Sequence, residues 1–138
     1  MASRTGQPAA LIHSAVGRHR WVIAEGYLPE GGLTGDPRLE SHETACILNA
    51  GESEAHVALT VFFSDREPAG PFVVTVPPRR TIHLRFNDLR DPERIPRGRD
   101  FSSVLESDVP IVVQHTRLDS RRAEIALFST LAWGDPTL

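Results

Sequence analysis

Hydrophobic and polar residues alternate along several short segments of the chain, and this period of two predicts β-strands. Within residues 79–86, Ile82, Leu84 and Phe86 alternate with polar residues, which is typical of a strand with one buried and one polar face. Residues 56–64 are apolar on both faces, which predicts a central strand covered on both sides, and residues 125–133 share this pattern. The other predicted strands are residues 21–28, 40–49, 72–76 and 109–117.

Turn-forming residues separate these segments, and no stretch has the period of a helix of three turns. The chain holds 11 prolines and 10 glycines, which interrupt helices and favour turns. The one helical feature expected is a short turn capped by Asp100 and extending through Leu105. Strands spaced about 8–15 residues apart predict an all-β fold, either an antiparallel sandwich or a barrel.

A chain of 138 residues has room for one domain. Residues 1–17 are small and polar with weak patterning, so we expect a mobile N-terminal arm, followed by the β domain in residues 18–138. No apolar run reaches the ~18 residues that a membrane-spanning helix needs, and the N-terminus lacks the apolar core of a signal peptide. We therefore expect a cytoplasmic protein without membrane insertion.

The charge composition narrows the classes of chemistry. All 15 basic residues are arginines, against 18 acidic residues, and the formal net charge is −3. The absence of lysine excludes Schiff-base chemistry, while guanidinium groups suit carboxylates and phosphates. A mildly acidic chain is not typical of a dedicated nucleic-acid-binding protein, although a local basic patch is compatible with the composition.

Motifs of common enzymes and metal sites are absent from the sequence. The single cysteine, Cys46, excludes an internal disulfide, and its apolar neighbours favour a core position over a reactive thiol. The six histidines include no His-x-His pair, so we expect no metal site. There is no Gly-x-Ser-x-Gly motif, and residues 31–35 match no phosphate-binding loop. We therefore predict a protein without catalytic residues or a cofactor, which is not an enzyme.

Polar residues on the predicted strands are the candidates for a binding site, because burying them costs free energy unless they find partners. A cleft for a sugar-like molecule would combine carboxylates with imidazole, guanidinium and amide groups, beside an aromatic ring. The candidates for this cleft are Glu25, Glu43, His83, Arg85 and Asn87, with Trp21 or Tyr27 as the ring. The alternative is a set of internal salt bridges without a ligand.

A second polar group follows the predicted strand 109–117. It consists of His115, Arg117, Asp119 and Arg121. His115 and Arg117 share one face of the strand, because side chains two residues apart point the same way. The arginines and Asp119 would either pair across a subunit interface or form a solvated polar network.

Four segments resemble the sensory rhodopsin transducer family, the soluble partners of cyanobacterial sensory rhodopsins. They are SHETACILNAG (residues 41–51), SDREP (64–68), RRTIHLRFNDL (79–89) and VPIVVQHTRLDSR (109–121). The resemblance implies a jelly-roll-like domain that forms a homotetramer and docks on a membrane photoreceptor as a non-enzymatic cytoplasmic signal transducer. The wider superfamily resembles small-molecule-binding domains with sugars as suggested ligands, and the resemblance also leaves a DNA-associated regulatory role open.

Strand pattern and resemblance together predict a single-domain antiparallel two-sheet sandwich with a jelly-roll-like arrangement. Its predicted core residues are Val57, Leu59, Val61, Ile82, Leu84, Phe86, Ile111, Val113, Leu127 and Leu131. The expected function is relay of a signal from a membrane photoreceptor or another sensor through protein–protein contacts. The alternatives are carbohydrate-like small-molecule binding and DNA-associated regulation.

Overall fold

The computed structural model describes residues 16–137, so the predicted N-terminal arm lies almost entirely outside the described residues. The strands are β1 (Arg18–Ile23), β2 (His42–Asn49), β3 (Ala55–Phe63), β4 (Ala69–Val76), β5 (Arg80–Arg85), β6 (Phe101–Asp119), β7 (Ala126–Leu131) and β8 (Trp133–Gly134). A 3₁₀ turn, η2 (Phe86–Asp88), follows β5. No helix within residues 16–137 has the length and apolar character needed to cross a membrane.

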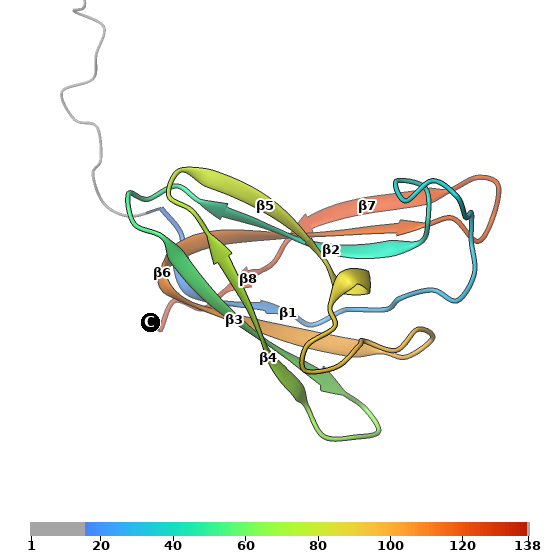
Figure 1. Ribbon diagram of the computed structural model, residues 1–138, viewed down its shortest axis with the longest axis horizontal. Coiled ribbons are helices and arrows are strands. Elements are labelled where there is room, and N and C mark those ends of the chain that lie inside the picture. Colours follow the sequence, from blue (N-terminus) through green and yellow to red (C-terminus); the bar gives the residue numbers. More distant parts are fainter. Residues whose placement is uncertain (1–15, 138) are drawn as a thin grey trace, which may run out of the picture.

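Strand β6 organises the fold because it pairs in both layers of the molecule. Its first half lies between β3 and β1, and its second half lies between β2 and β7. The outer strands are β4 beside β3, β8 beside β1, β5 beside β2 and β7 beside β6. Figure 1 shows β6 passing from one layer into the other. The pairs are antiparallel, which confirms the predicted all-β fold, and the two layers are joined through β6 into one hydrogen-bonded network.

The first half of β6 replaces the helical turn that was predicted after Asp100. Phe101, Ser103 and Leu105 are buried, and the residues between them are more exposed. That period of two belongs to a strand. The predicted helical turn is therefore wrong, because β1 and β3 flank this segment and supply ladder hydrogen bonds on both of its edges.

The hydrophobic core lies between the two layers. Ile47 of β2, Leu59 of β3 and Leu105 of β6 are fully buried. Most predicted core residues are confirmed as buried, namely Val57, Leu59, Val61, Phe86, Ile111 and Val113. Ile82 and Leu84 are only partly buried and pack against this core from β5.

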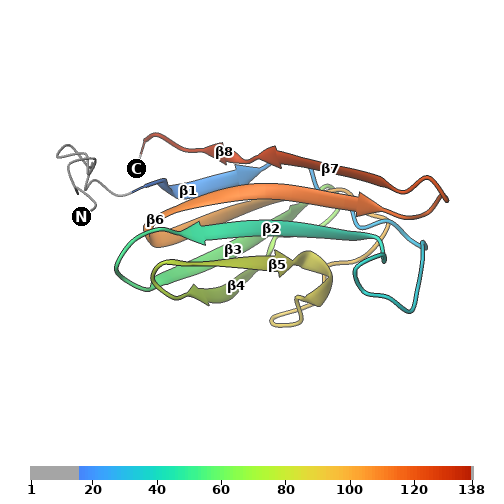
Figure 2. The same cartoon turned by 90° about the horizontal axis from the view of Figure 1, so that it is seen from above.

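Strand β7 is an edge strand whose side chains face solvent. Leu127 and Leu131, which were predicted in the core, are 65% and 64% exposed. This prediction is wrong because β7 pairs with β6 alone among the described strands, and no other element covers it. Figure 2 shows β7 and β8 following each other along one side of the molecule. The C-terminal segment therefore closes one side of the sandwich and leaves apolar side chains exposed.

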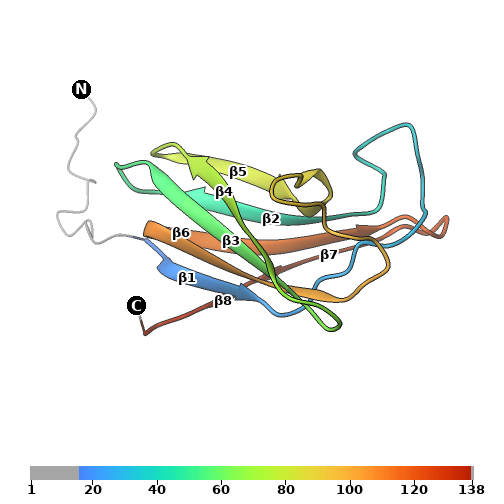
Figure 3. The same cartoon turned by 60° about the horizontal axis from the view of Figure 1, so that its bottom comes forward.

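The outer face of β3 is also uncovered in the described chain. Phe62 is 41% exposed, while Ala58 and Thr60 on the same face are half-buried. Figure 3 shows β3 and β4 on the near side of the molecule. The predicted cover on both faces of β3 is therefore wrong for residues 16–137: only the inner face packs on the core.

Candidate functional site

The most unusual polar residue of the fold is Glu43, a carboxylate without solvent exposure. It lies near the start of β2, on the inner face that also carries Ala45 and Ile47. An ionised carboxylate in such a place is strongly destabilising unless charged partners and hydrogen bonds surround it. Its partners therefore define a site.

Strand β6 supplies two of these partners. Glu43 pairs in register with Arg117, and Glu43 Oε1 accepts hydrogen bonds from Arg117 Nε at 2.8 Å and from the backbone N–H of Tyr27 at 2.7 Å. Glu43 Oε2 bonds His115 Nε2. Both oxygens of the buried carboxylate are thereby satisfied. His115 and Arg117 reach it together because residues two apart on a strand share a face.

Arg117 joins this buried pair to the surface. Its Nη2 lies 2.7 Å from Glu25 Oε1, and the Glu25 side chain is 65% exposed. Burial lowers the pKa of Arg117, but its hydrogen bonds to Glu25 and Glu43 raise it, and the net shift is upward. Arg117 is therefore a permanent cation between two carboxylates.

Phe128 of β7 covers the same cluster. Its ring meets the His115 imidazole edge-on with a centroid distance of 5.4 Å, and the Arg117 guanidinium lies 5.4 Å from its centroid. These contacts fix the orientation of both side chains. We call Glu25, Glu43, His115 and Arg117, with Phe128 over them, the Glu43 network.

An apolar cavity of about 450 Å³ adjoins the Glu43 network. It lies between the end of β1 and the β7–β8 segment, and we call it the Glu25 cavity. Its polar side chains include Glu25 and His115, and its apolar walls include Val22, Ile23, Leu131, Ala132 and Trp133. A concave apolar space with a few convergent polar groups is the usual form of a small-molecule site.

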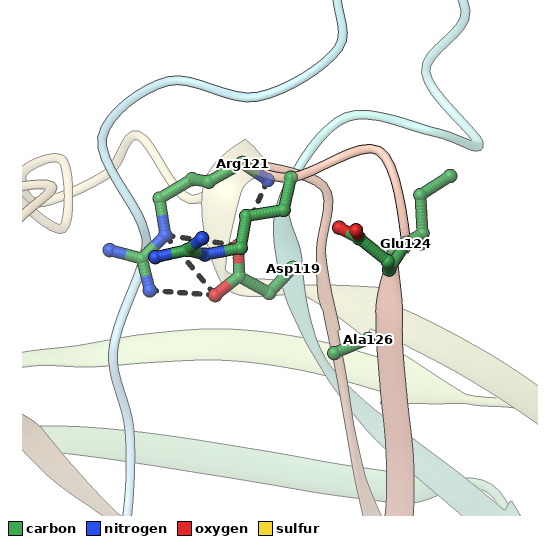
Figure 4. A pocket seen from close by; sticks show the side chains of 6 residues that line it. Asp119, Arg121, Glu124 and Ala126 are labelled. Carbon is green, nitrogen blue, oxygen red and sulfur yellow. Dashed lines mark hydrogen bonds and ion pairs between the residues drawn. The ribbon is translucent and has the colours of Figure 1, made fainter.

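Asp119 and Arg121 form a separate ion pair at the turn between β6 and β7 (Figure 4). The side-chain hydrogen bond between them holds the pKa of Asp119 below its usual value and that of Arg121 above it. The Arg121 guanidinium also lies 5.7 Å from the centroid of the Tyr27 ring. The pair lines an exposed cavity of about 550 Å³, with Glu124 across the turn (Figure 4).

The structure separates the residues predicted for the sugar cleft. Glu43 and Asn87 are together, because Asn87 Oδ1 accepts from the Glu43 N–H at 3.2 Å. His83 pairs in register with Cys46 on the outer face of the same layer, and Arg85 bonds the carbonyl of Pro37. Glu43 and His83 thus lie on opposite faces of one sheet, so the five polar residues do not converge in one cleft.

The two aromatic rings predicted for the sugar cleft, Trp21 and Tyr27, make other contacts. Trp21 is a core residue, 5% exposed, and its Nε1 donates to the carbonyl of Ile111 at 2.8 Å. Tyr27 contributes its backbone N–H to Glu43 and its ring to Arg121. The aromatic residues beside the network are instead Phe128 and Trp133. Both belong to the segment 125–133, which was predicted as a central strand covered on both sides. Apolar content does not distinguish an exposed edge strand from a covered central strand, so the sequence held no signal for their exposure.

A second polar surface lies on the outer face of β5, β2, β6 and β7. A cavity of about 400 Å³ there is lined by Cys46, Thr81, His83, Gln114, Thr116 and Ser129, among others. Gln114 Nε2 donates to Ser129 Oγ at 2.9 Å. Cys46 is half-buried on this face rather than in the core. We call this the outer-face cavity.

Within residues 16–137, no three histidine, cysteine or acidic side chains gather in a way that could hold a metal ion. Exposed His56 does bond two carboxylates, Asp108 and Glu54, through its two ring nitrogens. Since each nitrogen faces a different carboxylate, the three groups form a hydrogen-bonded chain.

Comparisons with known proteins place the fold in context. A family described as "Anabaena sensory rhodopsin transducer" matches residues 16–134. A solved structure of the Anabaena sensory rhodopsin transducer is 56% identical over 74% of this chain and 99% of that chain, with a TM-score of 0.67. The crystal structure of Thermotoga maritima 1070 is 32% identical over 87% of this chain and 97% of that chain, with a TM-score of 0.77. No curated protein matches the chain.

Proposed function

The chain belongs to the Anabaena sensory rhodopsin transducer family, and we propose that it is a cytoplasmic, non-enzymatic signal transducer that receives its signal from a membrane-embedded sensory rhodopsin. The family name and the match over most of the chain support this function. The observation in the structure that carries it is an uncovered apolar surface on an edge strand. Such a surface fits a protein that works through contacts with other chains, including copies of itself.

This β7 surface consists of Leu127 and Leu131, which share one face of the strand and are 65% and 64% exposed, whereas Phe128 lies on the opposite face over the Glu43 network. Exposed large apolar side chains of this kind mark interaction sites in soluble proteins. The backbone edge of β7 that faces away from β6 has no partner strand among residues 16–137. The unpaired N–H and C=O groups of an apolar edge strand can form hydrogen bonds with a strand of another chain. We propose that this surface is buried between copies of the chain in a homotetramer.

Light scattering tests the assembly. The full-length chain should have a mass near four chains at micromolar concentration, and Leu127→Ser should lower that mass by opening the β7 surface. Val73→Ser on β4 is the matched control, because Val73 is 73% exposed but lies on a different edge. A monomeric wild type, or a Leu127→Ser variant with the wild-type mass, contradicts the proposal.

Binding to a photoreceptor tests the relay itself. A microbial sensory rhodopsin encoded beside this chain, reconstituted in nanodiscs, should capture the purified protein with an affinity that changes on illumination. Equal binding in darkness and light would mean that no signal passes by this route. Absence of binding in both states would remove the rhodopsin as the partner.

Carbohydrate-like binding is a second candidate function, and the outer-face cavity favours it. Hydroxyl groups of Thr81, Thr116 and Ser129 stand there beside the amide of Gln114 and the imidazole of His83. This mixture of donors and acceptors suits the hydroxyls of a polyol. Calorimetric titration with a panel of monosaccharides tests it, with His83→Ala expected to weaken binding and exposed His56→Ala as the control. If no sugar binds, or if His83→Ala binds like wild type, the candidate fails.

A further inference from the structure

The tautomer of His115 is set by its partner. Arg117 is always charged and bonds Glu43 through Nε and Nη2, so Glu43 is held as a carboxylate. A carboxylate can only accept hydrogen bonds. The His115 nitrogen that faces it, Nε2, must therefore carry the proton. In the neutral imidazole the other nitrogen, Nδ1, is then a bare acceptor.

Solvent reaches this acceptor. The side-chain hydrogen bond of His115 within residues 16–137 is the one from Nε2 to Glu43, and Nδ1 does not belong to the buried atoms without a partner. The imidazole forms part of the wall of the Glu25 cavity. A ligand in the cavity that presents an N–H group can replace solvent as the donor to Nδ1.

The charges beside the cavity favour a cation. Glu25 and Glu43 carry two negative charges, and Arg117 between them supplies one positive charge. Glu25 uses Oε1 for Arg117, while its Oε2 has no hydrogen-bond partner among the described residues. Glu25 thus presents a carboxylate oxygen at the mouth of the cavity. A cationic ligand is attracted to that oxygen.

The walls of the cavity favour an apolar body on that cation. Val22, Ile23 and Ala132 contribute aliphatic surface. The Trp133 indole, 58% exposed, adds an aromatic face, and indole is the strongest aromatic partner for an ammonium group. A volume of about 450 Å³ accommodates a small organic molecule.

We propose that the Glu25 cavity binds a small organic amine in its ammonium form. The ammonium group donates hydrogen bonds to His115 Nδ1 and to the Glu25 carboxylate, and the apolar body packs against Trp133 and the aliphatic wall. This site shares Leu131 with the β7 surface and shares no lining residue with the outer-face cavity. It gives the chain a chemical input that does not depend on a rhodopsin.

Three probes of one shape and different charge test the site in the full-length protein. Benzylamine, benzyl alcohol and benzoate are titrated separately, with chemical shifts of the Trp133 indole N–H as the readout. We expect benzylamine to bind at least about fivefold more tightly than benzyl alcohol, the factor that a single cation–aromatic or rim ion contact supplies. Benzoate should not bind. Benzoate binding as tightly as benzylamine, or no binding of any probe at about 10 mM, overturns the proposal.

Two variants locate the binding. Glu25→Gln should weaken benzylamine about fivefold and leave benzyl alcohol unchanged, because it removes only the rim charge. The matched control is Glu93→Gln, an exposed carboxylate that is also ion-paired with an arginine, Arg66, away from the cavity. Trp133→Leu, followed by calorimetry, should weaken benzylamine more than benzyl alcohol. If Glu25→Gln binds benzylamine like Glu93→Gln does, the amine is not in this cavity.

Discussion

Among the charged residues, Arg117 has a large expected effect on stability, because the buried carboxylate of Glu43 depends on it. Arg117→Ala leaves the Glu43 carboxylate buried with one histidine and one backbone N–H. Removal of one partner of a buried ion pair typically lowers the free energy of unfolding by about 3–5 kcal/mol. Urea denaturation of wild type and variant measures this change.

An exposed ion pair provides the comparison for Arg117. The Arg38 side chain is 88% exposed and bonds Asp36 at 2.9 Å, so solvent and salt screen the pair. Arg38→Ala should leave the urea midpoint unchanged. Equal losses in Arg117→Ala and Arg38→Ala would show that the Glu43 network carries no special stability.

His56 should titrate at an unusually high pH. Its hydrogen bond to Asp108 is the main cause of a raised pKa, with a smaller contribution from Glu54. NMR titration should place the pKa of His56 above the ordinary histidine value of about 6.5. Asp108→Asn should lower it more than Glu54→Gln does. A larger effect of Glu54→Gln would contradict the assignment.

The same cluster makes a pH-dependent contribution to folding. Since the pKa of His56 is raised in the folded state, its stabilisation is fully present below the ordinary histidine pKa and is lost as pH rises through the raised value. The pKa of Asp108 is lowered by hydrogen bonds from the backbone and side chain of His56. Its stabilisation is therefore present above the ordinary aspartate pKa and is lost as pH falls through the lowered value.

At the residue scale the sequence revealed which polar groups matter but not how they assemble. Glu43 and His115 stood out as polar residues on predicted strands, and Arg117 as part of the charged run that follows an apolar strand. Strand alternation also places His115 and Arg117 on one face. It could not show that Glu43 of β2 pairs with Arg117 of β6, because register between distant strands depends on the whole fold. For the same reason His83 was grouped with Glu43, although their side chains lie on opposite faces.

At the scale of elements, most strands were predictable and their neighbours were not. The period of two located β2, β3 and β5 to within two residues at each end. The first half of β6 was missed because Asp100 was interpreted as the cap of a short helical turn that extends through Leu105. The burial of the last strand was misjudged because apolar content does not distinguish a covered central strand from an exposed edge strand. Only the strand pairing in the folded chain, in which β7 contacts β6 alone among the described strands, identifies β7 as an edge strand.

Asn49 joins two turns of the sandwich and offers a test at this scale. It is fully buried at the end of β2. Its Nδ2 donates to the carbonyls of Ser53, Val76 and Pro77, and its Oδ1 accepts from the Gly51 N–H. Asn49→Ala should lower the free energy of unfolding by about 1–3 kcal/mol, because buried backbone groups lose their partner.

Gln114 supplies the control for Asn49. It is exposed on β6 and makes one side-chain hydrogen bond, to Ser129. Solvent can replace that bond, so Gln114→Ala should shift the free energy of unfolding by no more than about 0.5 kcal/mol. Thermal and urea unfolding of the two variants are compared with wild type. An unchanged free energy of unfolding in Asn49→Ala would mean that water enters the site and hydrogen-bonds the backbone groups that Asn49 contacts in the wild type.

For the whole molecule, β6 makes the two layers interdependent. The layer with β3 and β1 and the layer with β2 and β7 each use half of β6, and both bury side chains in one core cluster. If either layer unfolded alone, half of β6 would lose its ladder partners while the other half kept them. That state would have unpaired backbone groups and exposed apolar core surface, and both raise its free energy. We therefore expect one cooperative transition.

The chain carries one natural reporter in each layer, which makes this expectation testable. Trp21 is buried on β1, and with Trp133 replaced by Phe its fluorescence reports on the first layer. The single thiol, Cys46 on β2, reports on the second layer through its reactivity towards a pulse of a thiol reagent.

Leu59→Ala and Ile47→Ala truncate fully buried side chains in the first and second layer respectively. Each should lower the free energy of unfolding by about 2–5 kcal/mol, and each should move the Trp21 and Cys46 transitions to the same lower urea concentration. Were Ile47→Ala to expose Cys46 while Trp21 fluorescence kept its wild-type midpoint, the layers would be separate folding units and β6 only a covalent link between them.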